Sequence, residues 1–229
     1  MSAQSFVVVD AEQRSDAWFT ARCGRLTGSV AGDMLATVKS GESASRRNLR
    51  LRLVLERLTG RPQESGFVTP TMQTGIDREA AAFAAFEALT GLVAVRTGFL
   101  QHTTLMAGCS LDGHMGQFET LLSIKCRQPA AHLDFIRSGT IPASAMAQMR
   151  HELWITGANS HTYFSWNPDF PPPLQQSRRL VTIARTDAEI PAYEEAALAF
   201  LDGVDLEVLA IQEQANLDIL PIQEQADGV

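Results

Sequence analysis

Basic residues are absent from the last part of this 229-residue chain. All 19 Lys and Arg residues lie at or before Arg185, where 15 acidic residues stand against them and leave a net charge of +4. Residues 186–229 contain 11 acidic residues and no Lys or Arg. The overall charge of −7 therefore combines a basic body with an acidic tail, and it does not exclude a polyanionic partner.

Cysteine is also scarce, with Cys23, Cys109 and Cys126 as its three occurrences. An odd number of cysteines argues against a secreted disulfide scaffold and favours buried free thiols. Cys109, His114 and Cys126 are conceivable zinc ligands, but their spacing matches no zinc pattern and no fourth ligand is evident. Long apolar runs and a charged leader followed by an apolar segment are missing too, so we expect a soluble, intracellular protein without membrane contact.

With 45% apolar residues, the chain can bury a substantial core. We expect one domain over residues 1–201, followed by an acidic, partly helical or disordered extension over residues 202–229. Apolar periodicity and end signals predict helices over residues 15–22, 30–36, 43–59, 69–89, 143–156 and 188–201. Ser29 and Ser43 are the predicted N-caps of the second and third, and Gly91 ends the fourth.

Strand-like runs cover residues 5–9, 92–100, 105–109, 117–125, 162–166 and 180–184. We expect the central three runs to form hairpins, with a turn at Asp112-Gly113. The order of the elements indicates an α/β fold, in which helices flank a central mixed β-sheet.

Two charged features each allow two interpretations. The helix predicted over residues 43–59 carries five arginines. They form either a solvated helix face or a face that contacts phosphates. Glu79 falls within the apolar periodicity of its helix, and it lies at the margin of the apolar stripe or points into a cleft.

Asp112 and the segment Ser123-Ile124-Lys125 have the layout of a metal-dependent phosphodiesterase centre. Such a centre places an aspartate at one strand end and Glu-x-Lys on a neighbouring strand, where alternation turns both charged side chains to one face. Lys125 lies in an otherwise apolar strand. A lysine there is either a strand-end side chain that reaches solvent along its stem or a member of the catalytic centre.

Several short segments, in their order and spacing, resemble the phage lambda exonuclease family, the alkaline exonucleases of viral recombination within the PD-(D/E)xK nucleases. The resemblance covers most of residues 13–201. It rests on Trp18–Arg22 with Gly24, Leu26–Ser29, Gly75–Glu79 with Ala81, Cys109–Gly113, Ile124–Cys126, Ala145–Met149 and Leu153–Thr156.

The resemblance implies a PD-(D/E)xK core and a Mg²⁺-dependent enzyme, in which Mn²⁺ could replace Mg²⁺. Asp112, Glu79 and the carbonyl of Ile124 would hold the metals, together with the residue at position 123, and Lys125 would assist the attacking water. Arg22, Ser29 and Ser110 match a pocket for the terminal 5′-phosphate of DNA. Gln148 matches a residue that supports the site.

The family also implies digestion of double-stranded DNA from 5′ to 3′, which leaves 3′ overhangs for a single-strand annealing recombinase. A homotrimeric ring around DNA is expected, in the cytoplasm of a bacterial host, from a phage or prophage gene. The acidic tail would point outward from that ring, or meet the annealing protein, or act as a solubilising extension.

The chain departs from the family pattern at four positions. Ser123 replaces the acidic residue of Glu-x-Lys, so magnesium affinity should fall sharply. Glu119 cannot substitute, because it lies on the order of 13 Å away along the strand, at about 3.3 Å per residue. Leu111 replaces a proline, His102 replaces an aspartate, and Arg150 stands where a second glutamine is common and could contact the DNA backbone.

The sequence is compatible with three functions. The first is the exonuclease, either inactivated at Ser123 or with a water completing a weak metal site. The second is a non-catalytic module that binds DNA ends and retains the nuclease fold. The third, a restriction or repair endonuclease, is disfavoured by the family-specific stretch from Gln148 to Thr156 and by the matches at Arg22 and Ser29.

Overall fold

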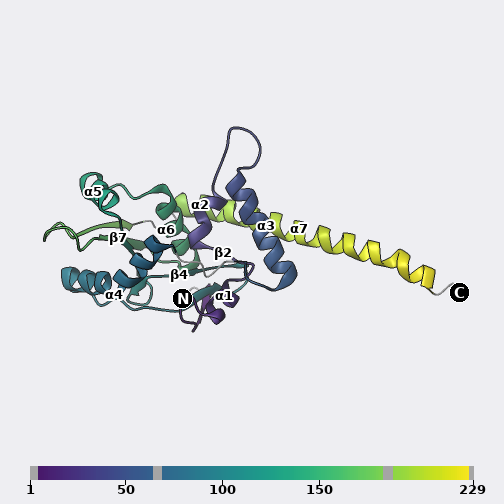
Figure 1. Ribbon diagram of the computed structural model, residues 1–229, viewed down its shortest axis with the longest axis horizontal. Coiled ribbons are helices and arrows are strands. Elements are labelled where there is room, and N and C mark those ends of the chain that lie inside the picture. Colours follow the sequence, from purple (N-terminus) through teal and green to yellow (C-terminus); the bar gives the residue numbers. More distant parts are fainter. Residues whose placement is uncertain (1–4, 64–68, 183–187, 227–229) are drawn as a thin grey trace.

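Two four-stranded sheets form the centre of the computed structural model, which describes residues 5–63, 69–182 and 188–226 (Figure 1). The first sheet has the order β1-β3-β4-β2, made by Phe6–Val9, Phe99–His102, Ala107–Ser110 and Leu26–Thr27. The second has the order β5-β6-β7-β8, made by Gly113–Met115, Thr120–Cys126, Ser160–Trp166 and Gln176–Thr182.

Both sheets mix parallel and antiparallel pairs, which confirms the predicted fold class. In the first sheet β2 runs parallel to β4, and the other pairs are antiparallel. In the second sheet β6 runs parallel to β7, between antiparallel partners at both edges. The expected single sheet is divided in two. Val95, which lies outside the named strands, forms an isolated antiparallel bridge with His114 of β5.

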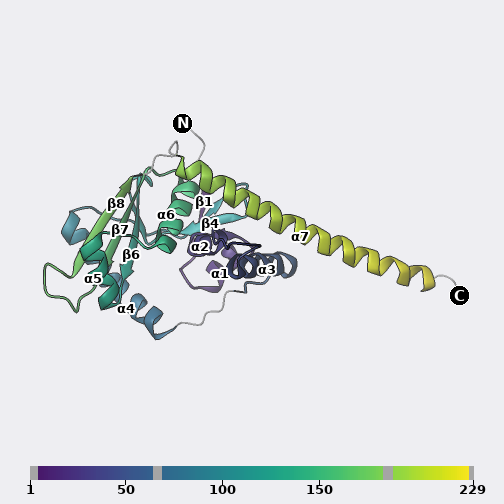
Figure 2. The ribbon, with the colours of Figure 1, turned by 90° about the horizontal axis from the view of Figure 1, so that it is seen from above.

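Helices cover the faces of these sheets (Figure 2). Leu122 and Ile124 of β6 pack on α4, whereas Leu121 belongs to the large core that α3, α6 and α7 share with the first sheet. The two faces of β6 therefore meet different helices. The helices are α1 Asp16–Arg22, α2 Ala31–Met34, α3 Ala44–Thr59, α4 Pro70–Thr90, α5 Pro129–Ser138, α6 Ala143–Thr156 and α7 Glu189–Ala226.

Local end signals explain most helix boundaries. The side chain of Ser43 accepts from the amide of Arg46 at 3.2 Å and caps α3, as predicted, and Gly60 ends that helix with a φ of +65°. Ser29 is not an N-cap, contrary to prediction: it lies in a single 3₁₀ turn over Gly28–Val30, and α2 begins after it. The Ser29 hydroxyl therefore does not cap α2 and is available to other hydrogen-bond partners.

The expected strand over residues 92–100 is wrong for most of its length, because only Phe99 and Leu100 of that run belong to β3. The predicted turn at Asp112-Gly113 is also wrong, since Gly113 already begins β5. The hairpin between β5 and β6 turns instead at Gly116 and Phe118, which have φ of +61° and +66°. The helix α5 was not predicted, and part of the run expected over 180–184 lies outside the described residues.

The last helix, α7, begins on the body and continues far beyond it (Figures 1 and 2). Its contacts with the body extend past residue 201, because Val204 is buried and Arg57 and Arg50 of α3 pair with Asp205 and Glu207. The acidic extension is thus helical at least to Ala226, and its first residues pack on the basic helix α3. None of the helices described is both long and apolar enough to cross a membrane.

Candidate active site

Asp112 and Lys125 meet at the junction of the two sheets. Asp112 follows β4, and its Oδ2 atom accepts a hydrogen bond of 2.7 Å from the backbone amide of Ile124 in β6. The Nζ atom of Lys125 lies 3.8 Å from the same oxygen. The fold therefore brings together the aspartate after β4 and the lysine of β6 that the sequence pattern singled out.

A cleft of about 570 Å³ opens over these residues. Glu79 of α4 lines it, so this carboxylate points into a cleft rather than only marking the edge of the apolar stripe. The Oε1 atom of Glu79 lies 3.7 Å from Nη2 of Arg96, and the guanidinium of Arg96 packs over the ring of Phe83. A second pocket of about 670 Å³ shares Glu79 and Asp112 with the first, so both carboxylates lie where the two pockets adjoin.

The electrostatic surroundings of Lys125 keep it charged. Burial disfavours the ammonium, but the carboxylates of Asp112 and Glu152 outweigh burial, and the pKa of Lys125 is raised above its usual 10.5. A protonated lysine at this position can stabilise negative charge on a bound phosphate, and it cannot act as a general base near neutral pH.

Ser123 is buried, with 2% of its surface exposed, and it does not line the cleft. Glu119 lies at the opposite end of β6, next to the turn at Gly116, and it is exposed. The carboxylate expected at position 123 is therefore not replaced from within its own strand.

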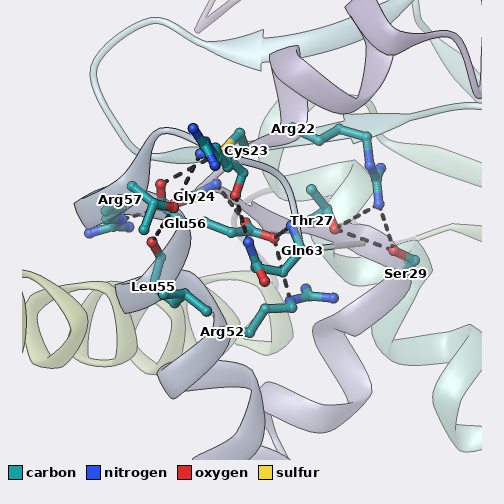
Figure 3. A network of polar contacts seen from close by, with 12 residues as sticks. Arg22, Cys23, Gly24, Thr27, Ser29, Arg52, Leu55, Glu56, Arg57 and Gln63 are labelled. Atoms are coloured by element: carbon teal, nitrogen blue, oxygen red, sulfur yellow. Dashed lines mark hydrogen bonds and ion pairs between the residues drawn. The ribbon is translucent and has the colours of Figure 1, made fainter. Parts of the chain in front are cut away.

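Arg22 and Ser29 lie together, as Figure 3 shows. The guanidinium of Arg22 donates to the hydroxyls of Thr27 and Ser29 at 3.3 and 3.2 Å. Ser110 joins them through Trp18, whose indole N–H donates to the Ser110 hydroxyl at 2.9 Å. The three residues predicted for a 5′-phosphate pocket thus come from α1, the 3₁₀ turn and β4, and Ser29 also lines the cleft.

A buried carboxylate, Glu56 of α3, anchors the segment that follows Arg22 (Figure 3). It accepts from the amides of Gly24 and Gln63 at 2.7 and 2.9 Å, and Arg57 donates to the carbonyl of Gly24 at 2.9 Å. These contacts fix the turn after α1 and hold Arg22 in place from outside the cleft.

The helix α6 places one expected residue in the cleft and turns another away. Gln148 lines the cleft, whereas Arg150 points to α7 and pairs with Glu189 at 2.6 Å. Arg14 and Tyr163 also line the cleft, and neither was predicted from the sequence. Arg14 has a φ of +72°, an unusual backbone for arginine, and no sequence signal marks it.

The three residues considered for zinc lie apart in the fold. Cys109 is buried in β4, Cys126 ends β6, and His114 stacks on Phe118 at a centroid distance of 3.9 Å. Burial raises the pKa of the Cys126 thiol to about 11. Within residues 5–63, 69–182 and 188–226, no three His, Cys, Asp or Glu side chains gather as a ready metal site.

The oxygen atoms around the cleft nevertheless fit a magnesium ion. Asp112 and Glu79 supply accessible carboxylates, and Ile124 supplies a backbone at the cleft wall. Mg²⁺ is commonly held by one or two carboxylates, with water and substrate phosphates completing its octahedron. Two acidic side chains are sufficient for such a site, although a third would bind the ion more tightly.

Comparison with solved structures gives a close match in fold. The alkaline exonuclease LHK-Exo from Laribacter hongkongensis, solved alone and in complex with dAMP, is 28% identical, with a TM-score of 0.79 over 88% of this chain and 98% of that chain. A phage-related exonuclease from Haemophilus somnus 129PT is 12% identical, with a TM-score of 0.62 over 82% of this chain and 96% of that chain, and it supports the fold alone. Among curated proteins, no relative matches.

A family profile matches residues 17–159, which include Arg22, Glu79, Asp112, Lys125 and Gln148. With the likeness to LHK-Exo, this match confirms the resemblance to the lambda exonuclease group. The match spans more than half of the sequence, and the chain belongs to the family of the YqaJ-like viral recombinase domain.

Proposed function

We propose that this chain is a Mg²⁺-dependent exonuclease that digests double-stranded DNA from 5′ to 3′ and leaves 3′ overhangs. The observation that supports it most directly is the arrangement of Asp112 and Lys125, 3.8 Å apart at a cleft that Glu79 also lines. LHK-Exo was solved with dAMP, a deoxynucleoside monophosphate, which is the class of product that a DNA exonuclease releases.

Asp112, Glu79 and the carbonyl of Ile124 would hold the metal, with Mn²⁺ as an alternative to Mg²⁺. The metal would supply Lewis-acid activation of the phosphate and of water. The amide of Ile124 holds Oδ2 of Asp112, which keeps the carboxylate oriented toward the cleft. Lys125, as an ammonium, would stabilise the negative charge that develops on the phosphate during attack.

The DNA end would be held by Arg22, Ser29 and Ser110. A guanidinium beside two hydroxyls offers several donors to phosphate oxygens, and Trp18 stiffens the arrangement through contacts with both Arg22 and Ser110. Because Ser29 lines the cleft, a terminal phosphate bound there would lie beside the metal-binding carboxylates. Gln148 would support the substrate from α6.

A homotrimeric ring around DNA remains part of the proposal, as does a single-strand annealing partner. In such a ring the basic body would face DNA, and the acidic helix α7 would extend away from it. A monomer by light scattering at working concentrations would contradict the ring.

One observation favours a second function, a non-catalytic module that binds DNA ends. Ser123 offers no anionic ligand, so metal binding would be weakened, while Arg22 and Ser29 would still bind a terminal phosphate. In this alternative Arg22 and Ser29 retain their role, and Lys125 contacts the DNA backbone without chemistry.

The deciding experiment is digestion of linear double-stranded DNA over a range of Mg²⁺ concentrations by the natural chain and by Ser123→Glu. We expect the natural chain to need more Mg²⁺, and Ser123→Glu to raise the rate at low Mg²⁺. DNA-end binding is measured in parallel with Ca²⁺. If neither protein digests DNA at any Mg²⁺ or Mn²⁺ concentration while both bind ends, the exonuclease proposal fails and the binding module stands.

A further inference from the structure

A second buried carboxylate lies directly behind the cleft. Glu152 of α6 has 1% of its surface exposed, and its Oε2 atom accepts from Nε2 of His161 at 2.5 Å. Its Oε1 atom accepts from the side-chain amide of Gln148 at 2.8 Å. Burial of a carboxylate is costly unless its hydrogen bonds are satisfied, and both oxygens of Glu152 are satisfied here.

The strand register places this carboxylate over the same sheet face as Ser123. His161 in β7 is the partner of Leu121 in β6, and Tyr163 is the partner of Ser123. Because partners in register point to the same side, His161 shares one face with Leu121, Ser123 and Lys125. Ser123 lies two residues from Leu121, on the order of 7 Å along the strand. Glu152 therefore covers the face from which the acidic side chain is missing.

Glu152 also determines how Gln148 presents its amide. A carboxylate only accepts hydrogen bonds, so the NH₂ group of Gln148 must face it and the carbonyl oxygen must face away. Gln148 lines the cleft, and this orientation makes a neutral oxygen available to a metal, a water or Lys125. Gly28 packs against both side chains, since a Cβ atom there would lie 3.4 Å from Gln148 and 3.5 Å from Glu152.

We propose that Glu152 is a positioning residue of the active cleft, which fixes the amide of Gln148 and supplies the negative charge that Ser123 does not. The inference rests on the proposed nuclease function. In this arrangement a carboxylate of helix α6 provides the negative charge that the Glu-x-Lys motif would place on strand β6. His161 holds the carboxylate in place through its Nε2 atom.

The test is a double-mutant cycle of Glu152→Gln and Ser123→Glu in the full-length chain. We expect Glu152→Gln to raise the Mg²⁺ concentration for half-maximal digestion about 10- to 100-fold, the usual effect of removing an outer-sphere carboxylate. Ser123→Glu should lower that concentration by a larger factor in the Glu152→Gln background than in the natural chain. Equal factors in the two backgrounds would overturn the proposal.

A measurement without turnover separates this inference from the nuclease function. Ca²⁺ added to the DNA-free protein should raise its Tm, and the increase should be smaller in Glu152→Gln and restored by Ser123→Glu. An unchanged increase in Glu152→Gln would overturn the role of Glu152, whether or not the chain digests DNA. Conversely, a chain that shows these shifts without digesting DNA would contradict only the proposed nuclease function.

Two further variants guard against a purely structural effect. Glu87→Gln removes a partly buried carboxylate outside the cleft, one that accepts from the amide of Ala94 at 3.0 Å, and it should lower Tm without changing the Mg²⁺ requirement. If Glu152→Gln does not fold, Gln148→Met keeps Glu152 and His161 and removes the oriented amide. Gln148→Met should then raise the Mg²⁺ requirement, and an unchanged requirement would overturn the proposal.

Discussion

The guanidinium carbon of Arg22 lies 4.1 Å from the ring centroid of Trp18. The same indole donates its N–H to Ser110, so one aromatic side chain connects two of the residues predicted for the 5′-phosphate pocket. Stacking on an indole face both attracts the cation and restricts the guanidinium plane. The same indole therefore holds both residues of the proposed pocket in position.

Arg22→Lys should reduce the preference for 5′-phosphorylated over 5′-hydroxyl ends. Lysine keeps the charge but loses the planar fork and the stacking on Trp18, and we expect the rate on phosphorylated ends to fall about tenfold, the value of one charge-assisted hydrogen bond. Initial digestion rates on the two substrates measure the ratio. Arg47→Lys, an exposed position on α3, is the matched control. An undiminished preference in Arg22→Lys would remove Arg22 from the pocket.

Lys125→Met should separate chemistry from binding. Methionine preserves the length of the apolar stem and removes the ammonium, so the single-turnover rate should fall roughly 100-fold or more, as when one contact to developing charge is lost. DNA-end affinity should change only slightly, because one phosphate contact contributes a small part of binding. Lys39→Met controls for loss of one exposed positive charge. A parallel loss of affinity and rate would instead indicate a DNA-binding lysine.

The sequence contained more information on the candidate site than on the sheets. Residue types and spacing singled out Asp112 and Lys125 as candidates, and the resemblance to the lambda exonuclease family favoured the catalytic interpretation of Lys125 over a solvent-reaching side chain. The separation of β4 and β6 into two sheets depends on pairing between distant segments, which local periodicity does not contain. The Asp-Gly pair at residues 112 and 113 resembles a hairpin turn, but here it leads from one sheet to the other.

Glu152, the proposed positioning residue, was not predicted from the sequence. It lies in α6 four residues after Gln148 and close to Arg150 and His151, in a stretch where a charged side chain usually marks the solvent margin. Its partner His161 belongs to β7, and only the folded chain brings the two together. The helix α5 was missed because its periodicity is short, although Pro129 at its start and Gly139 at its end are ordinary boundary signals.

Gly108→Ala should destabilise the junction that leads to Ser110 and Asp112. A Cβ atom at Gly108 would lie 2.4 Å from the ring of Phe99 and 2.5 Å from the carbonyl oxygen of Leu100. Both neighbours are fully buried, so we expect a loss of roughly 1–3 kcal/mol in the free energy of unfolding, measured by urea denaturation. Gly75→Ala is the control, because its Cβ would meet open space within a helix. There we expect a gain of about 0.5–1 kcal/mol. Equal stability of the two variants would contradict the close approach at Gly108.

His151 should make the protein less stable in mild acid. Burial lowers the pKa of His151 to about 4, and the imidazole joins three elements through the hydroxyl of Tyr193 at 2.8 Å and the carbonyl of Gly108 at 2.9 Å. The carbonyl only accepts, so Nε2 carries the proton and Nδ1 accepts from Tyr193, an arrangement that needs the neutral ring.

The unfolded chain binds this proton near pH 6.5, whereas the folded chain resists it until about pH 4. The contribution of His151 to the free energy of unfolding should therefore be fully present above pH 6.5. It should be lost as the pH drops from 6.5 to 4, which lowers the free energy of unfolding by roughly 3 kcal/mol. Urea denaturation across that range measures the slope. His151→Gln keeps one donor and one acceptor without a titrating group, so its slope should be shallower, with the lowered pKa of His114 contributing a remainder. Identical slopes would show that His151 titrates normally in the folded protein.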